Sequence, residues 1–238
     1  MSQIIVSGIK VEVVKKDIKN LHLAVYPPKG RVRIATPQRV NDEAIRLFIV
    51  SKIKWIKKQI KSFQEQERQS VREYINRESH YFQGRRYLIN IFEENKKPRV
   101  KIRNKSTIDL YARPGSSAEK REKILNEWYR EELKKQIPPI IDKWEKKIEV
   151  SVNDWGVKQM KTKWGSCNIE AKRIWLNLEL AKKPKICLEY IIVHEMVHLL
   201  ERHHNQRFIA LMNQYMPQWE SHKQELNRFP VSHSDWEY

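Results

Sequence analysis

The chain has 238 residues, enough to bury a sizeable core, and its 47 lysines and arginines against 29 acidic residues give a formal net charge of +18. Its two cysteines, Cys167 and Cys187, are too few for a disulfide scaffold and are better interpreted as packing residues in a reducing compartment. The N-terminus becomes charged too early for a signal peptide, and no apolar run approaches the roughly 18 residues of a membrane span. We therefore expect a soluble, cytoplasmic protein.

The first part of the chain predicts an antiparallel sheet followed by a long amphipathic helix. Apolar and polar residues alternate in short runs between residues 4 and 36. Asn41 is expected to cap the helix, which should pack on the sheet and expose a lysine-rich face. Its apolar positions recur at helical spacing: Ile45, Phe48, Ile49, Ile56, Ile60 and Phe63.

Residues 80–112 again predict strands, with a hairpin turn at Gln83-Gly84 before an alternating run. No catalytic pattern occurs in this part of the chain. We therefore interpret residues 1–150 as a basic α+β region that serves as a scaffold or substrate shelf.

A second amphipathic helix is predicted from Ser116 to Gln136, ending before Pro138-Pro139 because proline disrupts a helix interior. Its apolar positions are Ile124, Leu125, Trp128 and Leu133. A short helix should then extend to about Ile148.

Two short strands are predicted within residues 159–168 and 173–178, joined by a polar turn. Pro184 then breaks the chain ahead of a largely apolar helix, which we expect to be buried. Trp164 and Asn177, on the two strands, are interpreted as structural residues.

The apolar helix carries the pattern His194-Glu195-x-x-His198. Residues four apart on a helix lie on one face about 6 Å apart, so both imidazoles can bind one zinc ion, with Glu195 beside the bound water. Because buried histidines need partners and a metal is the simplest one, the pattern predicts metal-dependent hydrolysis.

A hydrolytic zinc site usually has a third protein ligand. His204 can supply it only if the chain turns after Leu200, because an unbroken helix would place it about 15 Å from His194. Metzincin proteases make this turn with a glycine at the position of Glu201, so that assignment is weak. Glu220 or Glu225 on a later helix is the alternative ligand, and His203 could instead cap the helix end as a cation.

Beyond the motif, one helix should end near Met216-Pro217, and another should turn Trp219, Leu226 and Phe229 inward. The predicted fold class is α+β. It combines an N-terminal antiparallel sheet with long amphipathic helices and a C-terminal, zincin-like, minimal helical domain with a short strand pair. We assign residues 151–229 to the metallopeptidase core and residues 230–238 to a loosely held tail.

Together these motifs resemble the YgjP-like metallopeptidase family, which is related to SprT-like and WLM zinc domains. The resemblance rests on Met160 to Cys167, Leu176-Asn177, Pro184, Tyr190 to Leu199 and Glu201 to Phe208. It implies one zinc ion bound by His194, His198 and His204, with Glu195 as the catalytic carboxylate. The family also carries a glutamate at Glu201, whereas Lys163 stands where the family usually has an arginine.

Peptide-bond hydrolysis is the leading functional hypothesis, with Glu195 moving the proton of a zinc-activated water. Glu201 is expected to hold a ligating histidine, and Lys161 and Lys163 are expected to bind a substrate carboxylate or phosphate. Hydrolysis of a nucleotide phosphoanhydride on the same metal is the second hypothesis. A noncatalytic nucleic-acid-binding protein with structural zinc is the third.

The basic excess lies upstream of the zinc helix. From Lys185 onward the chain has five basic and seven acidic residues, while residues 52–61 and 94–103 are rich in lysine and arginine. Such charge attracts polyanions, so nonspecific nucleic-acid contact through this half is one interpretation, and steering of acidic peptides or phosphorylated small molecules toward the metal is another. Basic solvated faces without a ligand are the plainer interpretation, since no nucleic-acid-binding fingerprint accompanies the charge.

Overall fold

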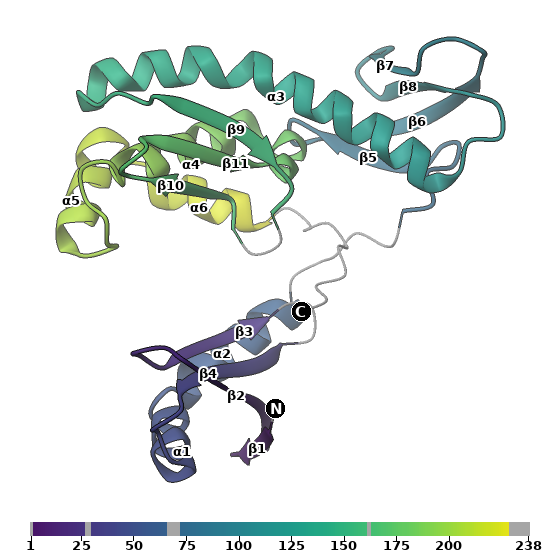
Figure 1. Cartoon of the computed structure of the whole chain (residues 1–238). Coiled ribbons are helices and arrows are strands. Elements are labelled where there is room, and N and C mark those ends of the chain that lie inside the picture. Colours follow the sequence, from purple (N-terminus) through teal and green to yellow (C-terminus); the bar gives the residue numbers. More distant parts are fainter. Residues whose placement is uncertain (1, 27–29, 66–71, 161–162, 229–238) are drawn as a thin grey trace. The chain divides into compact units, whose positions relative to one another are not determined.

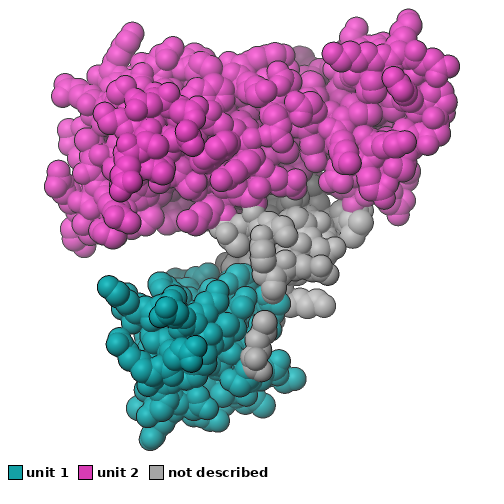
Figure 2. All heavy atoms as spheres, in the orientation of Figure 1, with its two compact units in different colours: residues 1–69, 233–238 teal, residues 70–232 magenta. Residues whose placement is uncertain are grey.

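The computed structural model describes residues 2–26, 30–65, 72–160 and 163–228. The chain forms two compact units, one built around residues 1–69 and the other formed by residues 70–232 (Figure 2). The predicted tail, residues 230–238, lies outside the described residues. The functional division at residue 150 stays a prediction.

The first unit contains a four-stranded sheet. Its strands are β1 (Ser2–Val6), β2 (Ile9–Lys16), β3 (His22–Tyr26) and β4 (Arg31–Pro37), in the order β1-β2-β4-β3. β2 and β4 run parallel, so the prediction of a purely antiparallel sheet is wrong. Alternating polarity identifies which side chains face the core, but it does not fix strand order, and β3 occupies the edge rather than the space between β2 and β4.

Two helices cover one face of this sheet, where a single long helix was predicted. α1 (Asp42–Ser51) and α2 (Ile53–Glu65) are separated at Lys52, whose backbone (φ −103°, ψ 5°) leaves the helical region. The predicted cap is confirmed, since the Asn41 side chain accepts a hydrogen bond from the Ala44 amide at 2.8 Å. Apolar side chains from both helices and the sheet form the core of the first unit: Ile4, Val6, Val11, Val13, Val32, Ile34, Ile45, Ile49 and Ile56.

The second unit begins with another mixed sheet. It consists of β5 (Ser79–Phe82), β6 (Arg85–Glu93), β7 (Arg99–Ile102) and β8 (Thr107–Ala112), in the order β5-β6-β8-β7. The predicted hairpin is confirmed, because β5 and β6 are antiparallel and joined by the two residues Gln83 and Gly84. β6 and β8 are parallel.

Helix α3 (Ala118–Ile148) is continuous through Pro138 and Pro139, so the predicted break before the prolines is wrong. Each proline removes one helical hydrogen bond, which costs roughly 3 kcal/mol in a helix interior. Buried residues on both sides of the prolines, among them Leu133, Ile137 and Ile141, pack into the same core and offset this cost. The helix therefore contacts both sheets of the second unit (Figure 1).

A third sheet precedes the motif helix. It contains β9 (Asp154–Lys158), β10 (Gly165–Asn168) and β11 (Arg173–Asn177) in the order β10-β11-β9, followed by the short 3₁₀ helix η1 (Leu178–Lys182). The predicted antiparallel pair is present as β10 and β11, but β9 adds a parallel third strand. β10 lies at the edge of this sheet and packs against the motif helix.

Three helices complete the second unit: α4 (Lys185–Val197), α5 (Gln206–Tyr215) and α6 (Trp219–Arg228). One hydrophobic core runs through this unit from Tyr74 to Leu226, so the motif helix α4 is buried on several sides. Cys187 lies in this core, and both cysteines are free thiols. Among the described helices, none has the length and apolarity needed to cross a membrane.

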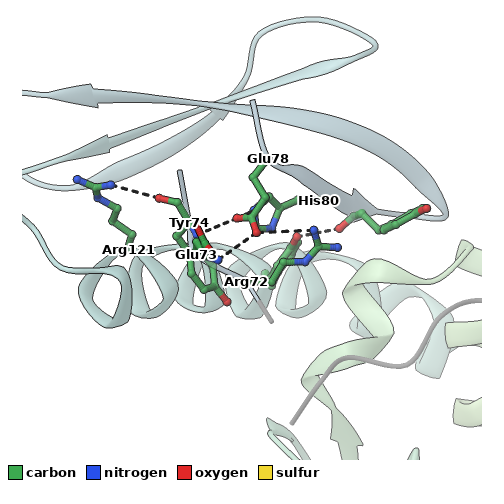
Figure 3. Close-up of polar contacts among 8 residues, drawn as sticks. Arg72, Glu73, Tyr74, Glu78, His80 and Arg121 are labelled. Carbon is green, nitrogen blue, oxygen red and sulfur yellow. Dashed lines mark hydrogen bonds and ion pairs between the residues drawn. The ribbon is translucent and has the colours of Figure 1, made fainter. Parts of the chain in front are cut away.

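A buried polar cluster fixes the chain where the second unit begins (Figure 3). The Glu78 carboxylate accepts the backbone amides of Glu73 and Tyr74 at 3.1 and 2.8 Å and lies 3.1 Å from Nε2 of His80. Arg121 on α3 donates to the Tyr74 carbonyl at 3.2 Å. The segment ahead of β5 is thereby held against α3.

Candidate active site

Helix α4 ends at Val197, with the motif residue His198 as its C-cap, as the third-ligand hypothesis requires. The amides of Leu200 and Glu201 both donate to the Val197 carbonyl, which closes the last turn. Helix α5 then begins at Gln206, and the side chain of its N-cap Asn205 accepts a hydrogen bond from the Phe208 amide at 3.0 Å. The predicted turn between Leu200 and His204 is thus confirmed.

This turn brings three histidines together. His194, His198 and His204 each offer a ring nitrogen, and these nitrogens lie within 4.8 Å of one another. Nε2 of His194 and Nε2 of His204 are 2.9 Å apart. The Phe208 ring contacts all three imidazoles, with ring centroids 4.7 to 5.0 Å from theirs.

The alternative third ligands do not join this group. Among the described residues, the three histidines form the cluster that could hold a metal ion, and neither Glu220 nor Glu225 belongs to it. His203 is exposed, and its amide donates to the Glu201 carboxylate at 3.1 Å.

The electrostatics of the cluster favour neutral imidazoles. Burial lowers the pKa of His194 to about 3, with further lowering by His198 and His204. Burial also lowers the pKa of His198 and of His204. A neutral imidazole keeps a lone pair for a metal, so the three side chains suit a divalent cation at neutral pH.

A ligating histidine normally has its other ring nitrogen held by a hydrogen bond. Nδ1 of His198 lies 3.1 Å from the Glu201 carbonyl oxygen, so Glu201 contacts this histidine through its backbone and not through its carboxylate. Nδ1 of His194 is buried without a hydrogen-bond partner among the described residues. Nε2 of His198 and the adjacent Nε2 atoms of His194 and His204 are the nitrogens that would hold a metal.

Glu195 is 5 % exposed and faces the edge strand β10. A Cβ atom on Gly165 would lie 2.6 Å from Oε1 of Glu195, closer than side-chain atoms normally approach. Burial raises the pKa of the Glu195 carboxyl to about 8, and Lys163 opposes this shift. Glycine at position 165 thus makes room for a buried carboxyl with a high proton affinity.

The histidines and Glu195 line a cleft of about 760 Å³. The edge strand β10 and helix α6 also line it, contributing Gly165 to Asn168 and Lys223. Lys163 lies in this lining, whereas the predicted Lys161 lies outside the described residues.

Asn177 holds the segment that carries Lys163. Its side-chain amide donates to the carbonyls of Met160 and Lys163 at 2.9 and 2.8 Å, while its Oδ1 accepts from the Met160 amide at 3.3 Å. These bonds agree with the structural role predicted for Asn177.

Several lining residues were not identified from the sequence. Arg202, Tyr190 and Lys223 line the cleft, and Phe208 packs under the histidines. No helical spacing links Phe208 to His204, because His204 lies in the turn before Asn205 caps α5. Lys223 has no such spacing either, because it comes from a separate helix.

Comparison with known proteins adds one finding. A family model described as "YgjP-like, metallopeptidase domain" matches residues 19–229, most of the chain. No curated protein matches the chain.

Proposed function

The chain belongs to the YgjP-like metallopeptidase domain family, and on this basis we propose that it is a zinc-dependent peptidase. The observation that carries the proposal is the convergence of three imidazoles beside a buried glutamate in one cleft. His194, His198 and His204 would hold one zinc ion per chain. When bound, zinc polarises a carbonyl and lowers the pKa of water.

Glu195 would act as the general base. Its carboxylate would accept a proton from the attacking water and deliver it to the nitrogen of the leaving amine. A buried site that raises the pKa of the carboxyl favours holding that proton between the two steps. The absence of a Cβ at Gly165 keeps the carboxyl at the cleft wall.

Strand β10 would position the substrate backbone. It is the edge strand of its sheet, and its residues Gly165 to Asn168 line the cleft. An edge strand presents unpaired amides and carbonyls, to which an extended peptide can add as a further strand. This arrangement suits a polypeptide substrate.

The base role can be tested with Glu195→Gln, which keeps the shape of the side chain and removes its proton affinity. Hydrolysis of a casein panel should fall about 10²- to 10⁴-fold, the range typical of a lost general base, while zinc content by elemental analysis stays unchanged. Glu220→Gln makes the same chemical change outside the histidine cluster and should retain both activity and zinc. Full activity in Glu195→Gln would refute the base assignment.

The third ligand can be tested with His204→Ala. The variant should lose most of its zinc at a metal concentration that saturates the unaltered protein, because two imidazoles hold zinc more weakly than three. Full zinc retention in His204→Ala would redirect the assignment to Glu220 or Glu225.

The same assays test the two alternative functions. Hydrolysis of a nucleotide phosphoanhydride has one observation in its favour, since Lys163, Arg202 and Lys223 line the cleft. A nucleoside triphosphate panel, run beside casein, separates it from peptide hydrolysis. A noncatalytic nucleic-acid binder would show neither activity and would keep its binding in Glu195→Gln.

A further inference from the structure

The cleft is lined by cations on three separate segments. Lys163 precedes β10, Arg202 lies in the turn after α4, and Lys223 lies on α6. Apart from the buried Glu195, Glu170 is the acidic residue in the described lining, and it lies in the turn between β10 and β11. The surroundings of the catalytic glutamate are therefore positively charged.

The positive charge of the cleft comes from the way the fold brings these residues together and not from an excess of basic residues in the nearby sequence. From Lys185 onward acidic residues outnumber basic ones, yet two of the five basic residues line the cleft. Two of these acidic side chains are engaged outside the cleft lining: Glu189 accepts from Lys143 and from Nε1 of Trp144, and Glu201 accepts from the His203 amide.

The lysines lie in the same cleft as the reactive groups. Lys163, Lys223, Glu195 and the three histidines all line it. Within the described ranges, Lys163, Arg202 and Lys223 take part in no ion pair. Lys223 lies over the Trp219 ring, 5.7 Å from its centroid.

We propose that the cleft selects peptides that carry acidic side chains beside the bond to be cut, with Lys163 and Lys223 as the specificity-determining residues. This inference rests on the proposed peptidase function. A peptide bound along β10 would project alternate side chains into the cleft, where carboxylates meet lysine ammonium groups. Arg202 adds a planar donor that can bind a carboxylate through two hydrogen bonds.

The selection can be measured without hydrolysis. Zinc-loaded Glu195→Gln would be titrated with three fluorescent peptides, identical except for Glu, Gln or Lys on both sides of the scissile bond, and the anisotropy recorded. The Glu peptide should bind about fivefold tighter than the Gln peptide for each exposed lysine contacted, and the Lys peptide should bind weakest. Added salt should reduce the difference, because these lysines are exposed.

Charge reversal gives the sharper test. Lys223→Glu, made in the Glu195→Gln background, should abolish the preference for the Glu peptide. Lys185→Glu makes the same change on an exposed lysine outside the cleft and should leave the preference intact. Circular dichroism verifies that each variant is folded, and zinc content verifies that its metal site is intact. If Lys223→Glu loses zinc, Lys163→Gln and Lys223→Gln replace it. Equal affinity for all three peptides, or equal effects of Lys223→Glu and Lys185→Glu, would overturn the inference.

Hydrolysis by the unaltered protein separates this inference from the proposed function. If the Gln peptide is bound and cut as well as the Glu peptide, the peptidase function stands and the acidic preference is wrong. If no peptide is cut but the Glu peptide binds in a lysine-dependent manner, the preference stands and the peptidase function is wrong. Hydrolysis of nucleoside triphosphates, with neither cleavage nor lysine-dependent binding of any peptide, would overturn both.

Discussion

Gly165 lies so close to the Glu195 side chain that no residue with a Cβ atom would fit there without a shift. A Cβ at this position would come within 2.6 Å of Oε1 and 2.8 Å of Cγ of the glutamate, so one of the two side chains would have to shift. Because both Glu195 and β10 are packed into the wall of the cleft, the displacement would fall on the carboxyl. Small displacements of a catalytic group can cost large factors in rate.

Gly165→Ala should therefore lower kcat for peptide hydrolysis by at least about tenfold while zinc content remains that of the unaltered protein. Gly156→Ala is the matched control, since its Cβ would crowd Trp175 in the same sheet and not Glu195. We expect this control to lower the melting temperature while keeping its activity per folded molecule. Equal kcat values for Gly165→Ala and the unaltered protein would contradict the positioning role of Gly165.

The sequence predicts the site only where local geometry determines it. His194, Glu195 and His198 can be grouped from their spacing because a helix fixes it. His204 required a turn whose position the sequence could indicate but not prove. Gly165 and Lys223 approach the motif through packing between separate elements, and no local pattern reports such contacts.

His80 is a second buried histidine, outside the cleft, and it makes stability depend on pH. Burial lowers its pKa to about 4, with Arg72 and Lys182 adding to the shift and Glu78 opposing it. In the unfolded chain its pKa is about 6.5. The folded state therefore binds fewer protons, so the contribution of His80 is complete above pH 6.5 and is lost as the pH falls toward 4.

His80→Asn, which keeps a polar side chain but does not titrate, tests this. Between pH 7.5 and pH 5 the free energy of unfolding of the unaltered protein should fall by about 1 to 2 kcal/mol more than that of the variant. Urea denaturation at both pH values measures the difference. A parallel decrease in the two proteins would show that other groups carry the acid sensitivity.

At the scale of elements, the sequence predicts the positions of strands and helices better than the pairing of the strands and the continuity of the helices. The alternation in residues 4–36 identified core-facing side chains such as Val11 and Ile34, but the parallel pairing of β2 with β4 depends on where β3 inserts. The prolines of α3 led to the wrong prediction of a helix break. They destabilise the helix locally, but the burial of Ile137 and Ile141 outweighs that cost.

The cost of the prolines is itself testable. Pro139 is exposed, so Pro139→Ala should restore an amide donor to the Lys135 carbonyl without disturbing the core. The gain in the free energy of unfolding should be about 2 kcal/mol, a rise of several degrees in the melting temperature, because the greater freedom of the unfolded chain without Pro139 offsets part of the roughly 3 kcal/mol cost. Lys134→Ala, an exposed change in the same helix that adds no backbone donor, should have a smaller effect. A lower melting temperature for Pro139→Ala would mean that the proline stabilises α3.

At the scale of the whole molecule, the two units have separate hydrophobic cores. The first core contains buried residues between Ile4 and Ile56, and the second contains buried residues between Tyr74 and Leu226. All residues of the candidate site lie in the second unit, whereas the lysines of α2 lie in the first. The lysines of α2 and the candidate metal site therefore belong to different units, whereas the basic run of residues 94–103 belongs to the same unit as the site.

A chain beginning at Ser70 should fold without the first 69 residues, because the core residues described for the second unit all lie between Tyr74 and Leu226. We expect cooperative thermal unfolding, one zinc ion per chain, and peptide hydrolysis within about threefold of the full-length rate, since no cleft residue is removed. The truncated chain should elute from heparin at lower salt, because the lysines that attract polyanions are fewer. Loss of zinc, or of hydrolysis in a folded truncated chain, would show that the first unit contributes to the site.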